Sequence, residues 1–294
     1  MTAVAKDTEQ SAEHTEEILE IPPEKIEWLN GFPTPPSPPI SPFHALAAVY
    51  RLVRNKEDTR QVFEIIQSLS GRSGKQLFKR FTATPYGRQV VTEPVKLEEI
   101  LSDHEKLRAL PGDSVGRAYL DFMEGENLTP EGLLEAAKDA GIDLEAYPEI
   151  KEYMRAFKHF EISHDLWHVL TGYGRDALGE LCNLGFTRAQ TGNSGIRLIT
   201  FIGGLAAKSE KSDQPFWRAI SEGERIGRDA EWLLEHDVEE LLPLPLAEAR
   251  RRLNIAEPAI YNAIPKDIKE TLLKPKVELT QAERERMRAQ NAPA

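Results

Sequence analysis

Two histidines stand four positions apart near the middle of the chain, and acidic residues lie beside and beyond them. His164 and His168 enclose Asp165 in the run His-Asp-Leu-Trp-His, and Glu180 follows after eleven further residues. Histidines at positions i and i+4 of a helix project from one face, with Cβ atoms roughly 6 Å apart, so both rings can reach one ion. Asp165 falls within the same arc of the helix, and Glu180 can complete the set from the next helix.

These side chains are typical ligands of a divalent metal ion. Neutral imidazole binds zinc, iron, cobalt or nickel, and carboxylates add oxygen donors that also suit magnesium or manganese. We therefore predict a metal site made by His164, Asp165, His168 and Glu180, and we expect the same four residues to be catalytic. If one carboxylate is not a ligand, Asp165 is the better candidate to orient an imidazole or to move a proton.

A metal-free hydrogen-bond network is the competing interpretation of the same residues. A His-Asp-x-x-His run is expected by chance in roughly one chain of this composition per hundred. However, the residues between and after the histidines are apolar, namely Leu166, Trp167, Val169 and Leu170. The helix is then buried on much of its surface, and burying two histidines and two carboxylates without a partner is costly. The context favours the metal site.

Two helices joined by a glycine-containing break are predicted to position these residues. Apolar spacing predicts a long helix over Ile150–Leu170, which carries both histidines. The run Thr171–Gly174 contains two glycines and should end it, and a second helix over Arg175–Gln190 then places Glu180 opposite.

Helical periodicity extends along most of the chain, so we predict an all-α, bundle-like single domain with a proline-rich N-terminal extension. The only β-like run is Gln89–Thr92. Further helices are predicted after Pro42, before Gly71, and over Leu97–Leu110, Ser114–Met123, Pro130–Ala140, Phe216–His236 and Leu246–Leu253.

The chain divides by composition into three parts. Residues 1–42 form an acidic and proline-rich extension, 43–260 the helical metal-binding domain, and 261–294 a C-terminal tail. Residues 1–30 are predicted to be disordered, or at most a short helix over Thr15–Leu29. The six prolines within Gly31–Pro42 favour an extended linker or surface strap.

The composition limits the possible partners and compartments. With 37 basic and 48 acidic residues the net charge is −11, which opposes general nucleic-acid binding. The absence of a long apolar segment, of a secretory signal and of an Arg-rich transit peptide predicts a cytoplasmic bacterial protein. The single cysteine, Cys182, is interpreted as a small core residue rather than a nucleophile.

The chain resembles the ubiquinone-biosynthesis Coq-four family (coenzyme Q biosynthesis protein four). The run from His164 to Glu180 is similar to that family's metal motif, and the match extends from about Ser41 to Pro258. An Arg-Tyr-Arg run expected close to the His-Asp pair is replaced by Met154–Phe160 further upstream, which indicates a divergent bacterial member. Other matching segments are Pro85–Arg88, Pro111–Tyr119 with Phe122 and Met123, and Arg251–Ile255.

The resemblance implies metal-dependent oxidative decarboxylation of a polyprenylated benzoquinone precursor, at the ring carbon that bears the carboxylate, with zinc as the expected ion. A non-catalytic scaffold that binds a prenyl lipid and organises other quinone-biosynthesis enzymes is the alternative. An unrelated metal-dependent hydrolase is a third hypothesis, although Asp165 is poorly placed to replace the glutamate base of His-Glu-x-x-His proteases.

The expected partners follow from the same resemblance. They are the polyprenylated aromatic substrate, other quinone-biosynthesis enzymes, a second copy in a possible homodimer, and the inner face of the membrane as a peripheral contact. An isoprenoid tail needs an apolar channel between helices. Leu198, Ile199, Phe201, Ile202 and Leu205 are candidates to line one, with ordinary core packing as the other interpretation.

Overall fold

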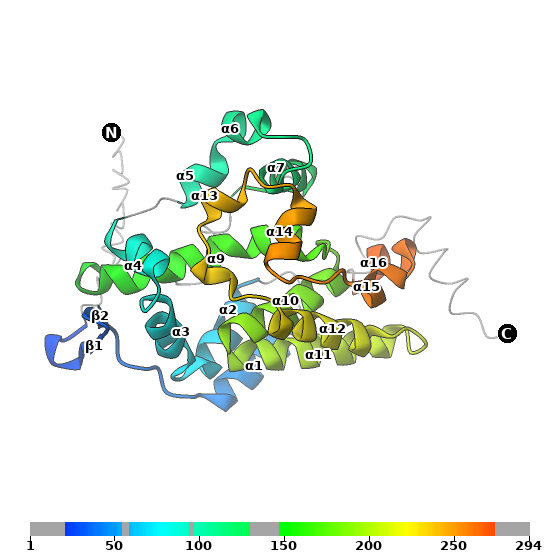
Figure 1. Ribbon diagram of the computed structural model, residues 1–294. Coiled ribbons are helices and arrows are strands. Elements are labelled where there is room, and N and C mark those ends of the chain that lie inside the picture. Colours follow the sequence, from blue (N-terminus) through cyan, green and yellow to red (C-terminus); the bar gives the residue numbers. More distant parts are fainter. Residues whose placement is uncertain (1–20, 55–58, 94–96, 127, 130–146, 274–294) are drawn as a thin grey trace, which may run out of the picture.

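The computed structural model describes residues 21–54, 59–93, 97–126, 128–129 and 147–273, and these fold mainly into helices (Figure 1). The all-α prediction is confirmed, and the sheet in the described part of the chain is one two-stranded hairpin. The elements are η1 (Pro23–Lys25), β1 (Glu27–Leu29), β2 (Phe32–Thr34), α1 (Pro42–Arg54), α2 (Thr59–Ser70), α3 (Ser73–Phe81), α4 (Pro85–Thr92), α5 (Leu97–Ser102), α6 (His104–Ala109), α7 (Val115–Glu126), η2 (Pro148–Ile150), α9 (Lys151–Thr171), α10 (Ala177–Thr191), α11 (Ser194–Glu210), α12 (Phe216–Asp229), η3 (Leu233–Glu235), α13 (Val238–Leu241), α14 (Leu246–Arg252), α15 (Ala259–Ala263) and α16 (Lys266–Thr271).

Helix α9 runs through the centre of the molecule, between α5, α6, α7 and α13 on one side and α10, α11 and α12 on the other (Figure 1). It confirms the predicted helix over Ile150–Leu170 to within one residue at each end. From Asp165 to Thr171 every residue of α9 is buried. A helix segment buried on all sides is held by neighbours all round, so the run that carries the histidines is rigidly placed.

Helices α10 and α12 approach each other closely because small residues line their contact. A Cβ atom on Gly223 would lie 2.3 Å from the Cys182 carbonyl oxygen, and one on Gly227 would lie 2.7 Å from that of Phe186. Cys182 is fully buried in this contact, and burial raises the pKa of its thiol. The interpretation of Cys182 as a core residue is confirmed, and the close packing fixes the helix that carries Glu180.

The N-terminal prediction is wrong for the described residues of the segment Thr15–Leu29. The described part of the segment has only the short 3-10 helix η1, and β1 and β2 pair as an antiparallel hairpin in which Trp28 faces Pro33. The turn is Asn30-Gly31, with φ angles of 51° and 88°, and this dipeptide suits a two-residue hairpin turn because both residues tolerate positive φ. From Pro35 to Ser41 the chain has no regular secondary structure and lies along the surface as a strap.

The β-like run Gln89–Thr92 is also a wrong prediction, because it forms the second half of helix α4. Thr84 begins that helix by accepting a hydrogen bond from the Gly87 amide, and Pro85 occupies its first turn. Val90 and Val91 are both buried, since two neighbouring positions of a helix can face a wide core. Adjacent β-branched residues gave the misleading strand signal.

Two predicted helices are each divided in the structure. Asp103 separates α5 from α6 and accepts a hydrogen bond from the Lys106 amide as a new helix cap. Helix α12 ends at Asp229 rather than at His236, because Gln190 of α10 holds the following turn: its amide donates to the Gly227 carbonyl and accepts from the Leu233 amide. Side-chain hydrogen bonds of this kind set where a helix ends, but they do not alter the apolar periodicity from which helices are predicted.

Some sequence predictions lie outside the described residues. They include the helix over Pro130–Ala140, the disorder of residues 1–20 and the C-terminal tail beyond residue 273. The three domain boundaries stay predictions. Within the described ranges, every helix is too short or too polar to cross a membrane.

Candidate metal centre

The turn between α9 and α10 sets the geometry of the candidate centre. Gly172 ends α9 in the left-handed conformation with φ 82°, and its amide donates to the His168 carbonyl at 2.8 Å. Arg250 of α14 reaches across and donates to the carbonyls of Leu170 and Val169 at 2.9 and 3.0 Å. These bonds satisfy the last carbonyl groups of α9, so the helix end is fixed in a defined position.

The start of α10 is equally constrained. Asp176 caps the helix by accepting hydrogen bonds from the amides of Leu178 and Gly179, and the Tyr261 hydroxyl donates to its other oxygen. That hydroxyl also accepts from the Gly174 amide at 3.1 Å. A Cβ atom on Gly179 would lie 2.1 Å from the Gly174 carbonyl oxygen, so only glycine permits this approach. The next residue is Glu180.

Three of the four predicted ligands converge on one point. His164 Nε2 and His168 Nε2 are 3.2 Å apart, and Glu180 Oε2 lies 3.3 Å from His168 Nε2 and 3.6 Å from His164 Nε2. Ligand atoms about 2.0–2.1 Å from a tetrahedral zinc ion are separated from one another by about 3.3–3.4 Å. The donor triangle therefore already has the size that a tetrahedral ion requires.

The hydrogen bonding of His168 fixes which of its nitrogens faces this triangle. Its Nδ1 lies 3.0 Å from the Tyr173 carbonyl oxygen, which only accepts, so Nδ1 is the donor. The neutral ring then presents a lone pair on Nε2 toward Glu180. Two lone pairs at this distance repel each other unless a positive charge lies with them, either a metal ion or a protonated His164, whose Nε2 lies 3.2 Å from that of His168. Phe122 stacks on the ring, with centroids 5.6 Å apart, and fixes its plane.

Asp165 does not lie in the triangle. Its carboxylate is buried and faces Arg175, with 3.9 Å between Oδ1 and Nη1. Arg175 also places Nε 3.2 Å from Glu180 Oε1, on the carboxylate oxygen that the histidines do not approach. The structure therefore brings together His164, His168 and Glu180 and places Asp165 beside them through Arg175.

Sequence reasoning missed two residues near the centre. Arg175 was assigned to the second helix but lies in the turn before it, where its charge neutralises the carboxylates. Glu161 precedes His164 by three residues, hence on the same side of α9, and its burial raises the pKa of its carboxyl group while the His164 charge opposes the rise. The spacing Glu161-x-x-His164 was the available signal for it.

His164 and Glu180 reinforce each other's charged forms. Burial alone raises the pKa of Glu180, but hydrogen bonds from His164 and His168 outweigh it, and the pKa falls far below its usual range. Burial alone would lower the pKa of His164. Its hydrogen bond to Glu180 and the charges of the nearby carboxylates outweigh the effect of burial, so the pKa of His164 is raised. The pocket is thus built for a positive charge next to Glu180.

The donor set fits a catalytic ion better than a purely structural one. His168 is completely buried, whereas the side chains of His164 and Glu180 are 24% and 31% exposed. Two imidazoles and one carboxylate would supply three ligands to an ion and would leave a fourth position for water or substrate. The exposed sides of His164 and Glu180 give a ligand access to that position.

Comparison with known proteins shows that the segment containing the candidate centre matches a protein family. The family model described as "Coenzyme Q (ubiquinone) biosynthesis protein Coq4" matches residues 43–259, which include the whole donor set. The chain is 28% identical over 189 residues to the mitochondrial "Ubiquinone biosynthesis protein COQ4 homolog" of Bos taurus, covering 64% of this chain and 68% of that protein. The human homologue is 26% identical over 190 residues, with 65% and 68% covered.

A further relative and one solved structure also match the chain. The chain covers 62% of the length of the Rattus norvegicus COQ4 homologue, at 27% identity, so its match to these relatives is partial. The crystal structure of a putative ubiquinone biosynthesis protein from Nostoc punctiforme PCC 73102 superposes with a TM-score of 0.55. That match covers 74% of this chain and 99% of the other at 17% identity, and it shows a shared fold.

Proposed function

Because the chain belongs to the Coq4 family of ubiquinone biosynthesis proteins, we propose that it performs a metal-dependent step of that biosynthesis. The step is oxidative decarboxylation of a polyprenylated benzoquinone precursor at the ring carbon that bears the carboxylate. The observation that carries this proposal is the triangle of His164, His168 and Glu180, whose donor atoms lie 3.2–3.6 Å apart.

The residues of the centre have separate roles in this proposal. His164, His168 and Glu180 would hold a divalent ion, and the ion would supply positive charge to a carboxylate or phenolate oxygen and to negative charge that develops on the ring. Arg175 is 36% exposed and has further N–H donors for the substrate carboxylate. Asp165 keeps Arg175 in place. In the net reaction, carbon dioxide leaves, water supplies the oxygen of the hydroxyl group that replaces the carboxyl group, and an acceptor such as dioxygen takes up the two electrons and two protons released.

The spacing of the donors supports zinc as the proposed ion. Adjacent ligands of an octahedral ion at about 2.1 Å lie only about 3.0 Å apart, whereas tetrahedral ligands lie about 3.3–3.4 Å apart. The three distances of 3.2, 3.3 and 3.6 Å are closer to the tetrahedral value. Two histidines and one carboxylate are also used by non-haem iron, so iron, cobalt, magnesium and manganese are the alternatives for metal analysis.

Helix α1 supports peripheral attachment to a membrane, the second part of the proposal. Phe43, Leu46 and Tyr50 follow one another along one face and are 86%, 56% and 62% exposed, and Ile40 precedes them at 65%. Pro42–Arg54 contains no acidic residue, although the chain as a whole is strongly acidic. An amphipathic helix of this kind suits a lipid surface with anionic headgroups. Phe43→Ser should weaken binding to anionic vesicles, and unchanged binding would contradict this part.

The candidate residues for a prenyl channel are distributed differently. Ile199 is buried in a cluster with Ala48 and Ile65, which is ordinary core packing. Phe201 and Leu205 are instead 53% and 50% exposed on α11. These five residues do not share one lining, and the binding of a prenyl tail, of other quinone-biosynthesis enzymes and of a second copy stays a proposal.

The substitution Glu180→Gln tests catalysis against the scaffold alternative. It nearly preserves shape but removes the negative ligand, so a catalytic protein should stay folded, bind prenylated lipid and accumulate a precursor that retains its ring carboxylate. The matched control is Glu270→Gln, which changes an exposed acid that pairs with Lys266 on its own helix. Normal quinone production by folded, metal-depleted Glu180→Gln protein would refute catalysis and favour the scaffold.

A further inference from the structure

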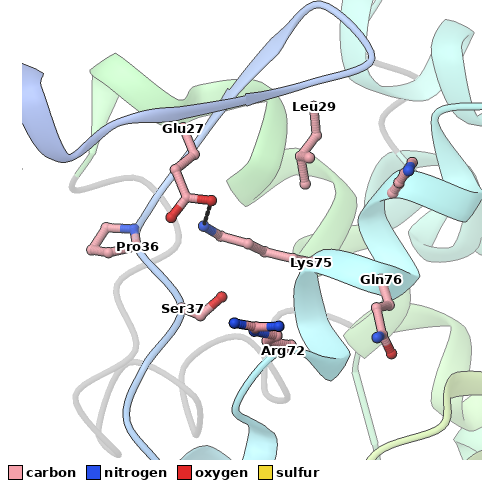
Figure 2. A pocket seen from close by; sticks show the side chains of 8 residues that line it. Glu27, Leu29, Pro36, Ser37, Arg72, Lys75 and Gln76 are labelled. Carbon is pink, nitrogen blue, oxygen red and sulfur yellow. Dashed lines mark ion pairs between the residues drawn. The ribbon is translucent and has the colours of Figure 1, made fainter.

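A hollow lies in the N-terminal part of the fold. It is bounded by strand β1 and the strap Pro35–Ser41 on one side and by helix α3 on the other. Its volume is about 390 Å³, and Figure 2 shows the side chains around it. Strand β1 and the strap contribute one wall, and α3 with the residue before it contributes the other. The lining residues are Glu27, Leu29, Pro36, Ser37, Arg72, Lys75, Gln76 and Lys79.

The hollow is strongly cationic for a chain of net charge −11. Arg72, Lys75 and Lys79 recur at helical spacing along one face, and Glu27 is the single acidic residue among the lining residues. Within the described ranges, neither Arg72 nor Lys79 has an ion-pair partner. Three positive charges against one negative charge leave an excess of two at this surface.

Lys75 is the most informative of the three cations. Its residue is only 8% exposed, and its ammonium lies 2.8 Å from Glu27 Oε2. Among the described residues it has no hydrogen-bond partner in suitable geometry, although an ammonium carries three N–H donors. One carboxylate oxygen cannot accept from all three N–H groups, and burying an ammonium with unsatisfied donors is unfavourable. The Lys75 ammonium therefore has N–H donors without an acceptor beside the hollow. In Figure 2 Lys75 and Glu27 point toward each other across it.

We propose that this hollow binds a phosphate group, either of a soluble phosphate ester or of a lipid headgroup. Arg72 offers planar paired donors, Lys75 its unsatisfied ammonium donors, and Lys79 a further charge. The Ser37 hydroxyl and the Gln76 amide supply neutral donors at the same surface. Leu29 and Pro36 provide an apolar wall for the carbon skeleton of the ligand. The site is independent of the metal centre and of the reaction proposed there.

The charge of Glu27 gives this proposal a distinctive test. Glu27 is 60% exposed and neutralises Lys75 when no ligand is bound. A phosphate group must therefore share Lys75 with a like-charged carboxylate. Glu27→Gln should tighten phosphate binding, whereas Arg72→Gln together with Lys79→Gln should weaken it. General attraction of anions would not predict the first effect.

The first experiment titrates inorganic pyrophosphate into the full chain by calorimetry. The Arg72→Gln and Lys79→Gln double variant should bind at least tenfold more weakly, since each lost contact is charge-assisted. The control is Lys106→Gln with Lys266→Gln, two lysines whose side chains are 87% and 86% exposed, which removes the same charge elsewhere. Binding of pyrophosphate at the metal centre would be equal in both double variants.

The second experiment distinguishes the source of the phosphate group. Vesicles of phosphatidylcholine with phosphatidic acid are sedimented with the wild-type chain and both double variants. Loss of vesicle binding only in the Arg72 and Lys79 variant assigns the site to a lipid headgroup, and unchanged vesicle binding with weakened pyrophosphate binding assigns it to a soluble ester. Equal affinities of the two double variants for pyrophosphate and for vesicles, or no tightening by Glu27→Gln, would overturn the proposal.

Discussion

Replacing His168 by alanine should remove the metal ion from a chain that still folds. His168 is the most buried member of the donor triangle, and its Nε2 lies 3.2 and 3.3 Å from the other two donor atoms. Structural zinc sites contribute about 10–16 kcal/mol through four ligands, or about 2.5–4 kcal/mol each. At about 1.4 kcal/mol per factor of ten, His168→Ala should weaken metal binding roughly 60- to 700-fold.

The assay is metal content per chain by mass spectrometry after dialysis, together with circular dichroism. His159→Ala is the matched control, because His159 is also a buried histidine of α9, only 4% exposed, and packs on Phe81 and Tyr86 instead of on the metal centre. Both variants lose one imidazole from the core and should lose similar stability, about 2–5 kcal/mol. Only His168→Ala should lose the ion.

Two results would refute the reasoning. The first is full metal content in folded His168→Ala protein, which would mean that the ion is held elsewhere. The second is equal metal loss in His159→Ala, which would mean that core stability rather than ligation controls the ion. Should His168→Ala fail to fold, His164→Gln provides the same test at a ligand whose side chain is 24% exposed.

Three further predictions follow from the surroundings of the centre. Gly179→Ala should lower the free energy of unfolding by more than about 2 kcal/mol in a denaturant titration, because its Cβ would lie 2.1 Å from the Gly174 carbonyl oxygen. The control Gly125→Ala has open space around the new Cβ and should instead stabilise helix α7 by up to about 1 kcal/mol. Arg175→Gln removes the 3.2 Å contact with the second oxygen of Glu180 and should weaken metal binding about 10- to 100-fold in a chelator competition; an unchanged affinity would dissociate Arg175 from the centre. Metal affinity should fall with acidification from above pH 6.5 downward, since the raised pKa of His164 lets protons compete early, and calorimetry at several pH values should detect the proton released on binding.

The same groups should give the metal-free chain an opposite pH dependence. The pKa of His164 is raised in the folded state, so its contribution to stability is complete below its ordinary value of 6.5 and is lost as pH rises through the folded value. The pKa of Glu180 is lowered, so its contribution is complete above its ordinary value of 4.5 and is lost only as pH falls well below that value. In chelator, thermal stability should therefore decline above pH 6.5.

The convergence of His164, His168 and Glu180 could be predicted from the sequence because their spacing is a local property of one helix pair. His164 and His168 share a face of α9 for the reason that residues four apart always do, and Gly172 ended that helix where expected. Glu180 lies within the first turn of α10, so its approach depended only on the short connection between the helices. Asp165 was grouped with them because angular spacing does not show how far a short side chain reaches.

The missed features depend on contacts between distant parts of the chain. The hairpin had a local signal in Asn30-Gly31, but acidic composition before it suggested disorder. Gln190 bonds to Gly227 at the end of α12 from 37 residues away and to Leu233 in the following turn from 43 residues away, and nothing in the sequence near Leu233 indicates that bond. Local apolar periodicity determines that a segment forms a helix. Where the helix ends depends here on long-range side-chain hydrogen bonds.

The precision of the centre likewise comes from outside the segment that contains its ligands. Arg250 fixes the end of α9 from 80 residues away, and Tyr261 joins Gly174 to Asp176 from 85–87 residues away. A two-helix fragment with the same ligands would lack both contacts, and its helices could separate at the turn. Because a donor triangle with edges of 3.2–3.6 Å tolerates little movement, α14 and α15 belong functionally to the centre although they supply no ligand to it.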